Sequence, residues 1–184
     1  HEPNGNIIGE VKTATLLQLH EDHTNFKRNH QALAERLQLQ SFPVELADLL
    51  HRYDTKLTTS TNWTVPEALY TLILTGTEVE GFASPLNVHP HAVIYYTLHD
   101  RDVVFGGNPD TFCSALAWKR PSARNPPFID KILLKTVEWA IKSAIKWEDT
   151  YHYLVVPGRN TSWKTHLALL RPPACHIICT SPPG

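Results

Sequence analysis

Apolar residues in the first third of the chain recur at helical spacing. Residues 10–39 are rich in Glu, Gln, Leu and Ala and hold neither Pro nor Gly, which predicts one or two helices. Residues 44–53 predict a short amphipathic helix that follows a Phe-Pro break. A further helix is predicted over 66–74, because Thr64 offers a cap before it and Gly76 a stop behind it.

From residue 77 onward, short apolar runs replace the helical spacing. These runs predict strands over 77–83, 102–105, 113–118, 151–156 and 176–179. A basic loop is predicted over 119–124, and helices over 88–98, 129–147 and, for one or two turns, 165–170. This alternation is typical of an α/β fold, whose ligands bind at the carboxyl ends of the strands. We therefore expect four segments to cluster at one edge of the sheet: 84–85, 106–107, 125 and 157–158.

Length and composition predict a globular protein with a buried core. The chain has 184 residues, of which 42% are hydrophobic and 19% are charged. We expect a helical extension over 1–64 and an α/β domain over 65–184, unless the two form one continuous domain. No run of ~18 apolar residues is present, so no membrane span is predicted.

The cysteine content and the N-terminus bear on the compartment. Three cysteines do not indicate a disulfide-stapled scaffold, and no short basic and apolar leader is visible. We therefore expect an intracellular protein, nuclear or cytoplasmic, rather than a secreted one. The chain begins at His1 and holds no Met, which indicates a piece of a longer polypeptide.

Charge is distributed unevenly along the chain. Residues 1–118 hold 7 Lys/Arg and 14 Asp/Glu, a net charge of −7, whereas residues 119–184 hold 10 and 4, a net charge of +6. The sum is −1. A basic half suggests a phosphate-rich partner on that side. A polarised surface without any ligand explains the asymmetry equally well.

The sequence Asn-Pro-Pro-Phe at residues 125–128 carries the most chemical information. Its prolines fix the backbone and remove two donors, which leaves the Asn125 amide and the Pro126 carbonyl rigidly presented before a helix. Two such oxygens can accept both hydrogens of a planar amine, and the Phe128 ring can stack on a heterocycle. The motif thus indicates a site that holds the amino group of a base in line with an electrophile. A simple chain break before a helix also explains the prolines.

Three segments in this order carry a family resemblance: Gly81-Phe82-Ala83-Ser84-Pro85-Leu86-Asn87, then Asp100-Arg101-Asp102 leading to Phe105-Gly106, then Asn125-Pro126-Pro127-Phe128. Over about residues 65–157, the chain resembles the methyltransferase domain of the phosphorylated-CTD-interacting-factor family, the cap-specific adenosine N6-methyltransferases. The resemblance implies a Rossmann-like methyltransferase sheet with S-adenosylmethionine as its cofactor. It also implies RNA as substrate, methylated on an adenine amine next to the mRNA cap, and a nuclear protein.

The resemblance assigns roles by motif match. Asn125, Pro126 and Phe128 would receive the adenine. The cofactor would be bound by residues of the two earlier segments: Ser84, Pro85, Asn87, Asp102, Phe105 and Gly106. The loop of Ser84 to Asn87 would border its methionine part, and Asp102 would lie near its ribose or adenine, where a carboxylate can accept hydrogen bonds from hydroxyls. Turn and cap duty explains Asp102 equally well.

Basic residues precede the Asn-Pro-Pro-Phe motif. Lys119, Arg120 and Arg124 are candidates for binding phosphates that flank a single-stranded or flipped adenosine. A solvated basic surface is the alternative. No metal site is predicted, because Cys175 and Cys179 on one strand would lie about 13 Å apart, too far for one ion.

Two other functions remain open on the sequence. One is a catalytically silent methyltransferase-like module that binds RNA or protein partners in a larger complex. The other is an amino-methyltransferase that acts on DNA or on protein glutamine, since motifs of the Asn-Pro-Pro-aromatic kind also serve those substrates.

Overall fold

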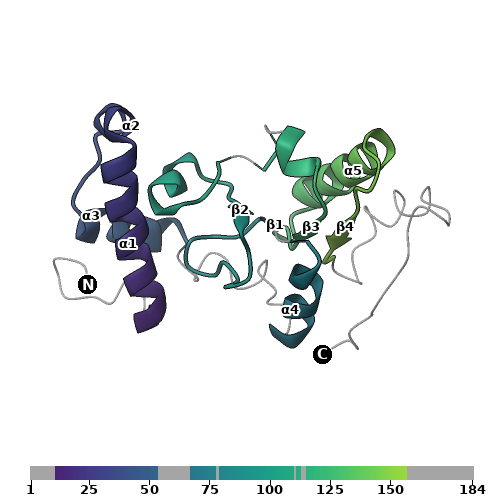
Figure 1. Cartoon of the computed structure of the whole chain (residues 1–184), viewed down its shortest axis with the longest axis horizontal. Helices are drawn as coiled ribbons and strands as arrows, with labels where there is room; N and C mark the ends of the chain where they lie inside the picture. Colours follow the sequence, from purple (N-terminus) through teal and green to yellow (C-terminus); the bar gives the residue numbers. More distant parts are fainter. Residues whose placement is uncertain (1–10, 54–66, 78, 110, 113–114, 157–184) are drawn as a thin grey trace.

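A computed structural model describes residues 11–53, 67–77, 79–109, 111–112 and 115–156 of the chain (Figure 1). They form a mixed α/β structure in which a small sheet lies beside a group of helices. The strand predicted at 176–179 and the helix predicted at 165–170 lie outside the described residues, as does the segment 157–158.

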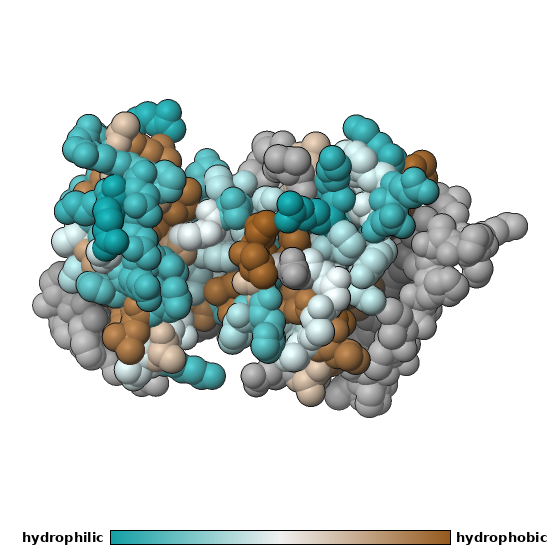
Figure 2. Space-filling model, in the orientation of Figure 1, coloured by the Kyte–Doolittle hydropathy of each residue, from teal (hydrophilic) through white to brown (hydrophobic). Residues whose placement is uncertain are grey.

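Three helices form the N-terminal helical region: α1 (Thr13–Asn29), α2 (Gln31–Arg36) and α3 (Phe42–Arg52). The predictions of helix over 10–39 and 44–53 are therefore confirmed. Pro43 is accommodated in the first turn of α3, where its missing N–H costs no hydrogen bond. Figure 2 shows hydrophilic side chains over the outer face of α1. The inner faces form one apolar cluster with a short 3-10 helix, η1 (Asp100–Phe105): Leu19, Phe26, Ala34, Leu49, Val104 and Phe105.

The sheet has four parallel strands in the order β2-β1-β3-β4. The strands are β1 (Val79–Gly81), β2 (Ile94–Tyr96), β3 (Ser122–Arg124) and β4 (His152–Leu154). At the carboxyl ends of the strands, Gly81 pairs with Tyr96 on one side and with Arg124 on the other, and Arg124 pairs with Leu154. After β2 the chain returns across β1 to build β3 on its other side, so the direction of winding changes between β1 and β3.

Helices cover both faces of the sheet. The helices α4 (Glu67–Thr75) and α5 (Asp130–Lys146) lie on opposite sides of the strands (Figure 1). On the α5 side, Val79, Tyr96 and Ala140 pack around Trp118 of a second 3-10 helix, η2 (Ala115–Trp118). On the α4 side, a smaller cluster consists of Tyr70, Leu74 and Ala123. The predicted helices over 66–74 and 129–147 are thus confirmed. Each has a wide apolar face formed by residues that are close together in the sequence.

Several predicted elements of the middle segment are wrong. Residues 88–98, predicted as a helix, contain the strand β2 behind a turn with Pro90. The predicted strands over 102–105 and 113–118 are the 3-10 helices η1 and η2, and the predicted loop over 119–124 contains β3. The described strands have three residues each. A run this short is too brief for alternation to distinguish a strand from a helical turn.

Candidate functional site

The chain leaves β1 in a strained conformation. Phe82, directly behind the strand, has a φ of +68°, which is rare for a bulky residue and concentrates at functional sites. A tight loop follows, in which the backbone N–H and the hydroxyl of Ser84 both donate to Oδ1 of Asn87, at 2.7 and 2.8 Å. The loop is tied back to β1 where the His89 N–H donates to a carboxylate oxygen of Glu80 at 2.8 Å. Burial raises the pKa of Glu80.

The Asn-Pro-Pro-Phe motif occupies the corresponding position behind β3. It spans the connection from β3 to α5, with Pro126 buried and Asn125 and Phe128 half-buried. The N–H of Ile129 donates to the carbonyl of Pro127 at 2.7 Å, which turns the chain into α5. Because β1 and β3 are adjacent and parallel, the motif and the Ser84 loop lie at the same edge of the sheet. This part of the predicted clustering is confirmed.

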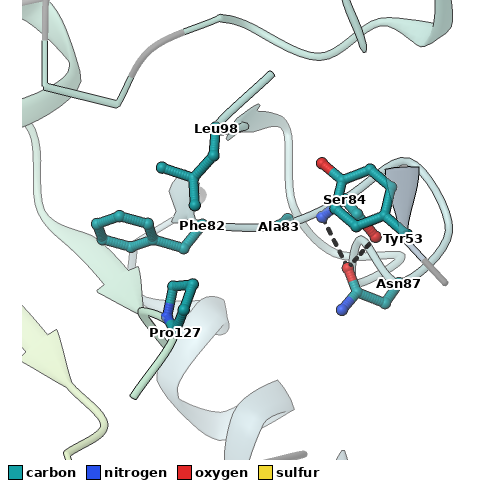
Figure 3. Close-up of a pocket in the computed structure, with 7 residues that line it drawn as sticks. All are labelled: Tyr53, Phe82, Ala83, Ser84, Asn87, Leu98 and Pro127. Carbon is teal, nitrogen blue, oxygen red and sulfur yellow. Dashed lines mark hydrogen bonds between the residues drawn. The ribbon is translucent and has the colours of Figure 1, made fainter. Parts of the chain in front are cut away.

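A hollow of about 60 Å³ lies between the loop and the motif (Figure 3). Figure 3 shows Phe82, Leu98 and Pro127 gathered on one side of it and Ser84, Asn87 and Tyr53 on the other. The described residues that line it are Tyr53, Phe82, Ala83, Ser84, Asn87, Leu98 and Pro127. We call this space the edge hollow. It lies outside the carboxyl ends of the strands at the point where the winding changes direction, which is where open α/β sheets bind ligands.

Asp102 and Phe105 lie away from the edge hollow, in the contact between η1 and the helical region. The side chain of Asp102 is fully buried; its Oδ1 accepts from Arg52 at 2.8 Å and its Oδ2 from the Tyr53 hydroxyl at 2.5 Å. Phe105 is a core residue, and Gly106 ends η1 with a φ of +84°. The prediction that the segment 106–107 follows a strand is therefore wrong, because η1 replaces that strand.

Tyr53 and Leu98 are lining residues that the sequence analysis did not identify. Tyr53 lies furthest from the motifs along the chain. It directly follows α3, about thirty positions before the Ser84 loop, and no motif marks it. Burial, and then the neighbouring charge of Asp102, raise the pKa of the Tyr53 phenol above its usual range. The hydroxyl therefore stays protonated and remains a donor to Asp102.

Arg124 occupies the interior of the sheet rather than its surface. Its side chain is fully buried, and its guanidinium lies 3.5 Å from the centroid of the Trp118 ring. Its nitrogens donate to Ser122 Oγ at 2.9 Å, to Thr111 Oγ1 at 2.8 Å and to the carbonyl of Ala117. Burial lowers the pKa of Arg124 to about 9. A phosphate outside the protein cannot reach this guanidinium as it is placed here.

Lys119 and Arg120 are exposed, but they precede β3 whereas the motif follows it. The three residues of β3 therefore separate them from Asn125 by about 10 Å of strand. The Lys119 carbonyl accepts a hydrogen bond from Thr150, which precedes β4, so this basic pair lies at the amino edge of the sheet. The structure does not bring the predicted basic residues to the edge hollow.

In the described part of the chain, no three His, Cys, Asp or Glu side chains are grouped so that they could hold a metal ion. Within the same ranges, no helix has the length and apolar character needed to cross a membrane.

Comparison with protein families gives a match that covers more than half of the chain. A family model described as "Phosphorylated CTD interacting factor 1 WW domain" matches residues 16–168. The matched residues include all but the first three residues of the helical region, the Ser84 loop and the Asn-Pro-Pro-Phe motif. Comparisons with curated proteins and with solved structures found no match.

Proposed function

The chain belongs to the phosphorylated CTD interacting factor 1 family, and from this premise we propose that it is an S-adenosylmethionine-dependent RNA adenine N6-methyltransferase domain with a Rossmann-like sheet. One observation carries the proposal: a single hollow is lined by Ser84 and Asn87, which the resemblance assigns to the cofactor, and by Pro127 of the Asn-Pro-Pro-Phe motif. The residues that the resemblance assigns to the adenine, Asn125, Pro126 and Phe128, flank Pro127 and are not among the described lining residues. Two segments about forty residues apart meet there because β1 and β3 are adjacent.

The residues at the edge hollow suit the reactive end of a nucleoside cofactor. Ser84 and Asn87 supply polar groups on one side, while Phe82, Leu98 and Pro127 supply an apolar wall on the other. At about 60 Å³ the hollow is smaller than the ~300–1,000 Å³ that encloses a whole ligand. The remainder of the cofactor would therefore extend out of the hollow.

The motif supplies the chemistry at the acceptor nitrogen. When bound, S-adenosylmethionine supplies a methyl group on a positively charged sulfur. The Asn125 amide oxygen and the Pro126 carbonyl would each accept one hydrogen of the adenine amine, which favours a pyramidal nitrogen and stabilises its developing positive charge. Asn125 and Pro126 would thereby hold the amine in line with the methyl group that the cofactor would supply, and the proton displaced from the nitrogen would leave to water. Positioning by the rigid prolines contributes further.

A second function is supported by the name of the matching family model. Its words refer to an interaction with a phosphorylated CTD and to a WW domain, a class of module that docks proline-rich segments on exposed aromatic residues. A silent methyltransferase-like module in a nuclear complex, with a protein partner, is therefore the alternative. In the described residues, however, Trp118 is fully buried beneath Arg124 and offers no exposed docking ring.

Methyl transfer from labelled S-adenosylmethionine to RNA tests the proposal. Wild-type protein is compared with Asn125→Ala on capped and uncapped RNA that begins with adenosine, and on DNA and glutamine-containing peptide. We expect transfer to RNA adenosine, and a loss of about 10²–10³-fold in kcat for Asn125→Ala, since one preorganised acceptor is removed. Calorimetry with S-adenosylmethionine separates the alternative: a folded wild-type protein that binds no cofactor is the silent module.

Full activity in Asn125→Ala contradicts the catalytic assignment, and transfer to DNA or peptide in preference to RNA contradicts the substrate class. Lys142→Met serves as the matched control. Lys142 lies on α5 in an exposed ion pair with Glu138, so this variant should retain wild-type transfer.

A further inference from the structure

The ring of Tyr53 is fixed beside the edge hollow by contacts at two places. Its hydroxyl donates to Asp102 at 2.5 Å, and Asp102 is itself held by Arg52 at 2.8 Å. The ring also meets His99 edge-on, with centroids 5.2 Å apart and planes at 89°. An aromatic side chain from the helical region is thereby held rigidly against a space that the sheet edge otherwise forms (Figure 3).

None of the described residues that line the edge hollow has a charged side chain. Among the described residues around it, the polar groups are Ser84, Asn87 and the phenol of Tyr53, and the rest are apolar. A cationic ligand group in such a space finds its most favourable electrostatic partner in the negative face of an aromatic ring. Donation of the Tyr53 hydroxyl to a carboxylate polarises the phenol and makes that face more negative.

We propose that the Tyr53 ring contacts the sulfonium centre of bound S-adenosylmethionine through a cation–π interaction, with Asp102 and Arg52 as positioning residues that act through the phenol. This inference rests on the proposed function, and it deepens it in two ways. It makes the helical region part of the cofactor site, and it gives Asp102 an indirect role in place of the direct ribose contact that the resemblance implies.

The test compares the affinities of S-adenosylmethionine and S-adenosylhomocysteine, which differ by the methyl group and the positive charge. Dissociation constants are measured by calorimetry for the wild type, Tyr53→Phe and Tyr53→Leu. Both variants lose the hydrogen bond to Asp102, but only Tyr53→Leu loses the ring, so the pair isolates the ring's contribution. Circular dichroism and thermal melting verify that each variant is folded, and Tyr53→Met replaces Tyr53→Leu if that variant does not fold.

We expect Tyr53→Leu to lose about tenfold in its preference for S-adenosylmethionine over S-adenosylhomocysteine, relative to Tyr53→Phe. Affinity for S-adenosylhomocysteine, whose sulfur is uncharged, should change similarly in both. If the role of Tyr53 is merely structural, its loss weakens the binding of both ligands alike and leaves the ratio of their affinities unchanged. That result overturns the inference while the proposed function stands. A folded wild type that binds neither ligand overturns both.

Discussion

Two arginine networks stabilise this protein in different ways. Between α3 and η1, the charges are paired reciprocally: Arg101 of η1 binds Glu45 of α3, and Arg52 of α3 binds Asp102 of η1. Both carboxylates are fully buried. Inside the sheet, Arg124 is equally buried, but no carboxylate in the described ranges pairs with it.

The two networks differ in how the buried charge is compensated. Burial by itself raises the pKa of Glu45, but hydrogen bonds from Arg101 and from the Gln40 N–H outweigh burial, so the pKa lies below its usual value. Arg124 has neutral acceptors and the Trp118 ring instead, and burial lowers its pKa to about 9. Removing an arginine therefore leaves an unpaired buried charge in the first network and only unfilled neutral acceptors in the second.

The Arg124 network, in which a buried cation has only neutral acceptors, continues through His152. Arg124 donates to Ser122 Oγ, whose hydroxyl lies 2.8 Å from His152 Nδ1. On the other side of the ring, Nε2 lies 2.5 Å from Ser143 Oγ, and Ser143 donates to the Ala140 carbonyl at 3.0 Å. Every donor hydrogen in this series of hydrogen bonds has an acceptor if the imidazole is neutral and carries its proton on Nε2. Burial, and then Arg124, accordingly lower the pKa of His152 to about 3.

The largest effect is expected when the ion pairs between α3 and η1 are broken. Arg101→Met should lower the free energy of unfolding by about 3–5 kcal/mol, because the Glu45 carboxylate stays buried without its partner. Urea denaturation followed by tryptophan fluorescence measures the loss. In the double variant Glu45→Leu/Arg101→Met, most of it should be recovered, since no charge remains. Lys142→Met removes one side of an exposed pair and should change stability by less than about 1 kcal/mol. Equal costs for the single and the double variant would contradict the view of a buried unpaired charge.

An intermediate effect is expected where β1 meets the Arg124 network. A methyl group on Gly81 would lie 2.4 Å from Nη1 of Arg124, so Gly81→Ala should cost about 1–3 kcal/mol by overpacking. The cost should shrink in an Arg124→Met background, where the guanidinium is gone. The matched control is Gly76→Ala, whose methyl group would meet only the Tyr151 hydroxyl at 3.6 Å. Thermal melts of the wild type, the two single variants Gly81→Ala and Arg124→Met, and the double variant measure the coupling. Strict additivity would show that Arg124 does not occupy this space.

The smallest effect concerns pH. Because the pKa of His152 is lowered to about 3 in the folded protein, the unfolded chain takes up a proton near its ordinary pKa of about 6.5 while the folded protein does not. The stability that neutral His152 contributes is therefore complete above about pH 6.5 and is lost as the pH falls below it. Between pH 6.5 and 5.5, the wild type should lose about 1 kcal/mol relative to His152→Gln. Parallel pH profiles of the two proteins would mean that His152 titrates normally when folded.

Much of the helical structure follows from local pattern. The helices α1 to α5 were all predicted within a few residues, because a wide apolar face repeats over several turns. The strands were predicted well only for β1 and β4. For β2 and β3, three residues were too few to show alternation, and strand identity depended on the neighbour that each one pairs with.

The candidate site also has parts that the sequence indicated and parts that it did not. The family resemblance pointed to Ser84 and Asn87, and the chemistry of its residues marked the Asn-Pro-Pro-Phe motif. The structure brings Ser84, Asn87 and, from the motif, Pro127 to the edge hollow. Charge alone suggested that Arg124 faces phosphate, yet its long side chain folds back beneath Gly81 and onto Trp118. Nothing in the sequence pattern relates Tyr53 to that edge.

The amino-acid sequence by itself determined the helices, the α/β character and the chemistry of the two loops, because these depend on residues near one another in the chain. Tertiary structure alone decided which strands are neighbours, that Tyr53 joins the edge hollow, and that one arginine is paired with acid while another is not. Those outcomes depend on contacts between residues distant in sequence, whose energies arise only when the chain has closed around them.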